Sequence, residues 1–124
     1  MKSEDEILLG PTEWRIMRSL WDLRSADPVQ IAERLRTRYG FDYSPQAAGI
    51  FLRRLAEKGY ACFVIAPAVG RGRPRHVYSP LIGEEEALRR QVLRFLQEYL
   101  IDDDRLDLVE SVLDAQRSLQ SKLG

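Results

Sequence analysis

The sequence contains one cysteine, Cys62, and one histidine, His76, in 124 residues. A single cysteine excludes a disulfide framework and a thiolate metal site within one chain, so we expect a reducing compartment. The lone histidine has no serine or cysteine nucleophile in a recognisable context, and no other catalytic constellation emerges. These absences argue against an enzyme and against a metal or other cofactor.

Long apolar runs are also missing. No stretch reaches the roughly 18 apolar residues that a membrane-spanning helix needs, and the acidic start of the chain is unlike a signal or transit peptide. We therefore expect a cytoplasmic protein with no membrane partner. The 44% hydrophobic content is enough for the core of one domain with an appendage, or of two very small domains.

An overall excess of charge is absent, because 19 basic residues balance 19 acidic ones. Taken alone, this balance argues against a nucleic-acid-binding protein. The distribution is uneven, however. Residues 34–79 contain nine Lys or Arg and two acidic residues, a net charge of +7, so the rest of the chain carries −7. A basic middle between acidic ends predicts that one part of the protein faces a polyanion.

The most informative stretch is Arg71-Gly72-Arg73-Pro74-Arg75, in which three guanidinium groups lie close together with no carboxylate nearby. Apolar runs at residues 60–66 and 76–79 predict the strands of a hairpin that projects these arginines away from the body. Such a loop either grips DNA phosphates regardless of sequence or, like the AT-hook that residues 71–74 resemble, enters the minor groove of A·T-rich DNA. We expect Arg73 to contact DNA in both cases.

Three helices are predicted before this hairpin. The first begins at Pro11, and the others, spanning residues 27–40 and 44–59, each begin with an N-cap residue followed by proline. Their apolar faces recur at helical spacing and are formed by Trp14, Met17, Leu20, Trp21, Val29, Ile31, Ala32, Leu35, Ala48, Phe51, Leu52 and Leu55. Three short helices followed by a β-hairpin is the order of a winged helix-turn-helix domain, whose third helix lies in the major groove.

Four segments carry a further resemblance: Leu9–Met17, Tyr43–Pro45, Leu52–Tyr60 and Tyr78–Leu81. In this order and spacing, their Glu-Trp, Ser-Pro and Arg-Leu-x-x-Lys-Gly elements resemble the penicillinase-repressor family over roughly residues 7–95. The resemblance implies a homodimeric transcriptional repressor that binds pseudo-palindromic operator DNA. It also implies a mainly α chain with a small β-hairpin, in which residues 7–81 form the winged helix-turn-helix domain and residues 82–124 the dimerisation helices.

The candidate DNA contacts lie on the third helix and on the hairpin. They are Ser44, Gln46, Ala47, Ile50, Arg53, Arg71, Arg73, Arg75 and His76. The family usually has Lys or Gln, Thr, Arg and Thr at the exposed helix positions, where this chain has Gln46, Ala47, Gly49 and Ile50. Gln46 can still pair with an adenine edge, and Ala47 and Ile50 can meet thymine methyl groups. Gly49 has no side chain, so direct readout should be sparse, unless this glycine instead admits the close approach of another backbone.

Two amphipathic helices are predicted at the end of the chain. The first covers residues 84–101, and the second follows Asp102-Asp103-Asp104, which can cap it. Glu84-Glu85-Glu86 stands likewise at a helix N-terminus, so we interpret neither acidic run as a metal site. Because the winged domain supplies its own core, we expect a second copy of the chain to bury both helices. The alternative is that they fold back onto their own domain.

The inducing signal is not apparent, so an unknown inducer or sensor protein is a candidate partner. Copper-responsive members of the family carry a cysteine-rich tail, and antibiotic-responsive members are cleaved at an Asn-Phe bond, whereas this tail has no cysteine and the chain contains no Asn. Four aromatic residues are expected to fill the core, although they could line a ligand pocket between the hairpin and the last helices. They are Phe63, Tyr78, Phe95 and Tyr99.

Two alternative functions are compatible with the same residues. A protein-interaction module that no longer reads DNA fits the zero net charge and the altered third helix, and it would show no salt-dependent affinity for a duplex. A non-specific DNA-binding protein that acts only through its Arg-rich hairpin would bind unrelated duplexes almost equally. The dimeric, sequence-specific regulator is the function that we expect.

Overall fold

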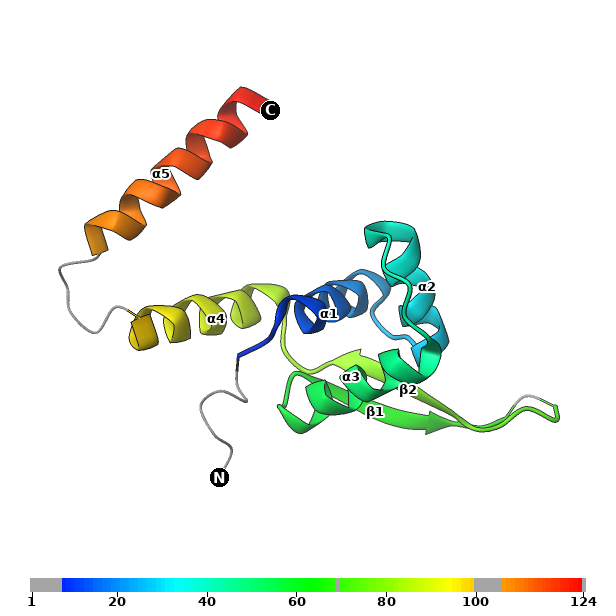
Figure 1. The fold of residues 1–124 in the computed structure, drawn as a ribbon. Helices are drawn as coiled ribbons and strands as arrows, with labels where there is room; N and C mark the ends of the chain where they lie inside the picture. Colours follow the sequence, from blue (N-terminus) through cyan, green and yellow to red (C-terminus); the bar gives the residue numbers. More distant parts are fainter. Residues whose placement is uncertain (1–7, 69, 100–105, 124) are drawn as a thin grey trace. The chain divides into compact units, whose positions relative to one another are not determined.

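The computed structural model describes residues 8–68, 70–99 and 106–123. Its elements are α1 (Pro11–Leu23), α2 (Pro28–Tyr39), α3 (Pro45–Glu57), β1 (Ala61–Ala66), β2 (Arg75–Pro80), α4 (Glu84–Tyr99) and α5 (Leu106–Leu123) (Figure 1). Three helices followed by an antiparallel hairpin confirm the mainly α, winged helix-turn-helix fold predicted from the sequence. The chain divides into two compact units, residues 1–89 and 90–124.

The predicted helix starts are confirmed. The Oδ1 atom of Asp27 accepts a hydrogen bond from the backbone N–H of Gln30 at 2.9 Å, and the Oγ atom of Ser44 accepts one from the N–H of Ala47 at 3.1 Å. These bonds satisfy amides that a helix leaves unpaired in its first turn. At the other end of α2, Gly40 adopts the left-handed conformation (φ +73°), which glycine reaches without strain.

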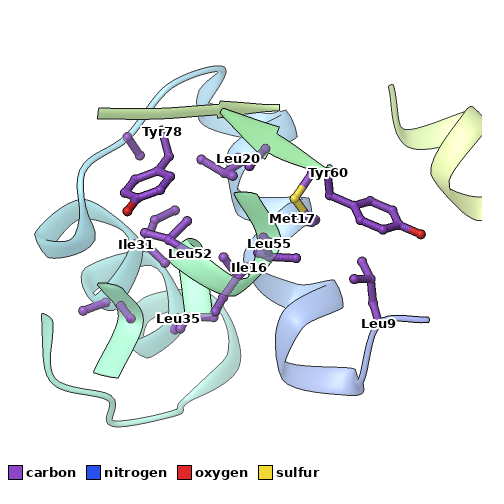
Figure 2. Close-up of a cluster of buried hydrophobic side chains, with 14 of the residues drawn as sticks. Leu9, Ile16, Met17, Leu20, Ile31, Leu35, Leu52, Leu55, Tyr60 and Tyr78 are labelled. Carbon is purple, nitrogen blue, oxygen red and sulfur yellow. The ribbon is translucent and has the colours of Figure 1, made fainter. Parts of the chain in front are cut away.

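One hydrophobic core joins α1, α2, α3 and the hairpin (Figure 2). Its fully buried side chains include Ile16, Met17, Leu20, Ile31, Leu35, Leu52, Leu55 and Tyr60. The prediction that Val29 belongs to this core is wrong, since its side chain is 62% exposed. Ile31 and Leu35 lie four residues apart and share a helix face, whereas Val29, two residues before Ile31, lies on another face.

The hairpin projects from this core. The strands pair from Ala61 opposite Pro80 to Ala66 opposite Arg75, so β2 begins one residue earlier than predicted. Figure 1 shows the connecting loop extending beyond the three helices. We call β1, β2 and the loop of residues 67–74 the wing.

Gly49 lies within α3, where the surroundings have room for a larger residue. A Cβ atom there would lie 3.7 Å from Cγ of Pro28, an ordinary van der Waals contact with a side chain. The alternative that Gly49 admits a closely approaching backbone is therefore wrong. Because alanine is about 1 kcal/mol more favourable than glycine inside a helix, we expect Gly49→Ala to raise the free energy of unfolding by about that amount. Urea denaturation followed by circular dichroism measures this change, and a lowered midpoint would contradict the expectation.

The second unit exposes much of its apolar surface. Its large exposed apolar side chains are Val92, Leu93, Phe95, Tyr99, Leu108, Val112, Leu113 and Leu119.

The prediction that four aromatic residues fill the core is correct for Tyr78 alone, which is 3% exposed. Phe63, Phe95 and Tyr99 are exposed. The predicted cap at Asp102-Asp103-Asp104 lies outside the described residues. Within the described ranges, no helix is both long and apolar enough to cross a membrane.

Candidate nucleic-acid interface

Five of the nine basic residues in segment 34–79 form ion pairs with acidic side chains. The pairs are Arg34–Asp22, Arg38–Asp22, Arg36–Glu33, Lys58–Glu13 and Arg75–Asp27. The other four are Arg53, Arg54, Arg71 and Arg73, which have no acidic partner in the described part of the chain and lie on α3 or in the wing loop. Since a carboxylate offsets the charge of the arginine that it contacts, the positive charge of this segment that no ion pair offsets lies on α3 and in the wing.

The exposed face of α3 carries three of the predicted contacts. Gln46, Ile50 and Arg53 are exposed and, at spacings of four and three residues, share one face of the helix. Ala47 is half-buried beside them. The hydroxyl oxygen of Ser44 caps the helix, but its hydrogen is free to donate to a phosphate. The structure therefore brings these predicted residues together at the N-terminal half and centre of α3.

Arg53 also faces the wing. It lines a groove between α3 and the hairpin together with Tyr78. Burial raises the pKa of the Tyr78 hydroxyl from its ordinary value of 10.0, and the nearby positive charge of Arg53 partly opposes that rise. Arg53 thus stands between the two basic elements, where it can contact a ligand that spans both.

The wing presents its predicted residues in two ways. Arg71 and Arg73 lie in the loop and are exposed, with no hydrogen bond or ion pair to another described residue. His76 is exposed on β2, where its ring centroid lies 5.1 Å from that of Phe63. The loop arginines are therefore free to contact phosphates or the minor groove, whereas His76 belongs to the surface that faces α3.

Arg75 lies at the base of the wing and is held by another element. Its Nη1 atom donates to Oδ2 of the buried Asp27 at 3.0 Å, and Asp27 also caps α2. Next to this pair, Ala26 and Tyr78 exchange two backbone hydrogen bonds of 2.9 and 2.8 Å. These contacts fix the wing to the start of α2. No local sequence signal indicated the pair, because its members are 48 residues apart.

We expect Arg75→Gln to weaken duplex binding without removing a phosphate contact. Losing the Asp27 contact loosens the wing, for which we expect about a fivefold loss of affinity, roughly 1 kcal/mol. The dependence of log Kd on log salt should keep its slope, because each lost phosphate contact changes that slope by about one. Asp27→Asn, which can still cap α2, should produce the same loss, and the double variant should lose no more.

Arg73→Gln is the matched control, since this arginine has no hydrogen bond or ion pair to another described residue and its loss should lower the salt slope by about one. Fluorescence anisotropy over a series of salt concentrations measures all four variants. A lower slope for Arg75→Gln, together with unchanged binding by Asp27→Asn, would show that Arg75 contacts DNA directly.

The fold and its basic surface define the class of winged helix-turn-helix regulators. The solved structures that share the fold include the following two. A complex of RosR from H. salinarum is 17% identical, with 96% of this chain and 99% of that chain covered at a TM-score of 0.54. A PadR family transcription regulator from Clostridium difficile R20291 is 21% identical, with 72% and 93% covered at a TM-score of 0.52. At these identities the likeness shows the fold alone.

The chain belongs to the penicillinase repressor family, whose family model matches residues 9–123. This confirms the resemblance seen in the sequence and makes the chain a DNA-binding regulator. The monomeric form of Bacillus licheniformis BlaI, solved in complex with the blaP half-operator, is 24% identical, with 63% of this chain and 85% of that chain covered at a TM-score of 0.45. No curated protein matches the chain significantly.

Proposed function

We propose that the protein is a homodimeric transcriptional repressor that binds operator DNA through α3 and the wing. One observation carries the proposal: the four arginines without a carboxylate partner in the described part of segment 34–79 all lie on these two elements. In a winged helix-turn-helix, the third helix enters the major groove and the flanking elements contact the backbone. Gln46 and Ile50 would then face base edges, and Arg53 would contact a phosphate.

The wing supplies the second part of this interface. Arg71 and Arg73 would reach either the phosphates beside the site or the adjacent minor groove, and both modes depend on their charge. Arg75 would act indirectly by holding the wing in place, as its contact with Asp27 suggests. A bound regulator of this kind represses by covering a promoter.

A promoter–reporter assay tests repression. With the region upstream of the protein's own gene placed before a reporter, co-expression of the protein should lower reporter output. The variant carrying both Arg71→Ala and Arg73→Ala should restore the output at equal protein level. Unchanged output with the wild-type protein would contradict autorepression.

We further propose that residues 82–124 form the dimerisation region. The support is the apolar surface that α5 exposes within one chain, where Leu108, Val112 and Leu119 lie at spacings that place them on one face. A two-fold dimer would bury the same face of both copies. Two-fold symmetry would also suit the pseudo-palindromic operator that the family resemblance implies, because each copy would contact one half-site.

Sedimentation equilibrium tests the dimer. The wild-type protein should sediment at twice the 14.3 kDa mass of one chain, and the double variant Val112→Glu with Leu119→Glu should sediment at that mass, because two carboxylates would be buried without partners. Ser121→Glu is the control, since it lies two residues after Leu119 and on another face. A wild-type monomer at all concentrations, or a double variant that stays dimeric, would contradict the proposal.

A second candidate function is sequence-independent DNA binding. The features that favour it are the apolar Ile50, which is 55% exposed at the centre of the α3 face, and the absence of polar side chains at Ala47 and Gly49. With few base contacts, affinity would come mainly from phosphates and would depend little on sequence.

A further inference from the structure

A groove separates the C-terminal half of α3 from the wing. Its volume is about 340 Å³, and it is lined by Arg53, Ala56, Glu57, Phe63, His76 and Tyr78. This volume lies at the lower end of the roughly 300–1,000 Å³ typical of small-molecule sites. The groove therefore suits a ligand of about one ring.

The wing side of the groove is aromatic. The centroid of the Phe63 ring lies 5.1 Å from that of His76 and 5.4 Å from that of Tyr78, with interplanar angles of 47° and 41°. Phe63 is nevertheless 46% exposed, so a large part of its ring has no protein neighbour. A planar aromatic ligand could cover that surface and gain both apolar burial and ring–ring contact.

The α3 side of the groove carries a charged group at each end of one helical turn. Arg53 has no acidic partner within the described ranges, so its guanidinium is available to a carboxylate. Glu57 lies four residues further along on the same helix face, so the Cβ atoms of the two residues are about 5–6 Å apart. The negative charge of Glu57 disfavours a second anionic group on the ligand, whereas its carboxylate oxygens can accept a hydrogen bond from a hydroxyl.

We propose that this groove binds a planar aromatic monocarboxylate with a hydroxyl at the far end of the ring, and that this ligand competes with DNA. The carboxylate would pair with Arg53, the hydroxyl would donate to Glu57, and the ring would lie on Phe63. Competition follows because the ligand takes Arg53 and fills the space between α3 and the wing. This second part rests on the proposed use of α3 and the wing as the DNA interface.

Isothermal titration calorimetry with 4-hydroxybenzoate tests the site in the absence of DNA. The wild-type protein should bind this probe at least about tenfold more tightly than 4-hydroxybenzamide, which lacks the charge, or cyclohexanecarboxylate, which lacks the aromatic ring. Phe63→Ala and Arg53→Gln should each weaken binding by about tenfold or more. Val64→Ala should change it by less than about twofold, because Val64 follows Phe63 on β1 and points to the opposite face.

Phe63→Leu separates a lost ring from a lost fold, because it keeps apolar volume at this position. It should melt near the wild-type temperature and still bind the probe several-fold more weakly. No binding of 4-hydroxybenzoate by the wild-type protein, equal binding of the amide, or full binding by Phe63→Ala would each overturn the site, whatever the protein does with DNA.

Anisotropy of a labelled duplex tests the competition. Saturating 4-hydroxybenzoate should raise the apparent Kd for DNA by about fivefold or more, roughly 1 kcal/mol, and Phe63→Ala should abolish that rise. Probe binding with unchanged DNA affinity would overturn the competition. A protein that binds the probe but no duplex at low salt would overturn the proposed DNA function while the aromatic-carboxylate site stands.

Discussion

Replacing Arg71 and Arg73 together by alanine is expected to lower the affinity for operator DNA about a hundredfold. A hydrogen bond to a charged group contributes about 1.5–3 kcal/mol when it is not offset by another partner, and neither arginine has a carboxylate partner within the described residues. A loss of about 1.5 kcal/mol for each arginine, the lower end of this range, is slightly more than tenfold, and two such losses multiply to about a hundredfold. The salt slope should also fall by about two, one for each lost phosphate contact.

Arg36→Ala is the matched control for this double variant. Arg36 is an exposed arginine of the same basic segment, but its guanidinium pairs with Glu33 at 2.6 Å. Its removal should change the affinity by less than about twofold, because surface ion pairs of this kind contribute little. If both variants lost affinity equally, overall charge would govern binding, and the wing would have no particular role.

Leu52→Ala is expected to lower the free energy of unfolding by about 2–5 kcal/mol. Leu52 is fully buried in the core between α3 and the neighbouring helices (Figure 2). Truncation removes its buried methyl groups and leaves a cavity, since the surrounding structure relaxes only partly. For a domain of this size the loss is a large fraction of the roughly 5–15 kcal/mol that holds a native protein together.

Ile50→Ala, on the same helix, is the control for this stability prediction. Its side chain is 55% exposed, so the loss should stay within about 0.5–1 kcal/mol. Thermal and urea unfolding followed by circular dichroism measure both variants. Equal losses at the two positions would show that α3 does not pack through the face that contains Leu52.

The local features of the fold could be predicted because their causes are local. Asp27-Pro28 and Ser44-Pro45 provide an N-cap and a first-turn proline within two residues, and both helices begin there. The hairpin was predicted for the same reason, since its apolar runs flank a turn of glycine, proline and arginine. Each of these signals acts over a few residues, and the packing of the domain left these helix starts and the hairpin where the signals predicted them.

Features that depend on contacts between distant residues could not be predicted. The three arginines of the wing are alike in sequence, yet Arg75 contacts the carboxylate of Asp27, while Arg71 and Arg73 have no ion pair among the residues that the structure describes. The burial of aromatic residues was equally hidden, because Phe63 and Tyr78 lie opposite each other on the hairpin and only Tyr78 meets the core. Apolar composition favours burial but does not specify which residues are covered.

The candidate site was predicted in outline for a different reason. Exposed residues at spacings of three and four on a helix share a face whatever the core contains, so Gln46, Ile50 and Arg53 could be grouped in advance. Of the five ion pairs that offset basic residues of segment 34–79, only Arg36–Glu33 is local, with its members three residues apart. The other four join residues at least 12 positions apart and could not be seen in the sequence. Among the described residues, the basic side chains of this segment without an acidic partner therefore lie on α3 and in the wing loop, where we propose the DNA contacts.

Fluorescence anisotropy with two labelled duplexes tests sequence-specific DNA binding most directly. One duplex comes from upstream of the protein's own gene, and the other is a scrambled sequence of equal A·T content, each titrated at low and moderate salt. We predict salt-sensitive binding that favours the upstream duplex by at least tenfold, about 1.4 kcal/mol, and that is lost in the Arg71→Ala, Arg73→Ala variant. Equal binding to both duplexes would contradict an operator in that region, and no binding to either at low salt would contradict a DNA-binding role for α3 and the wing.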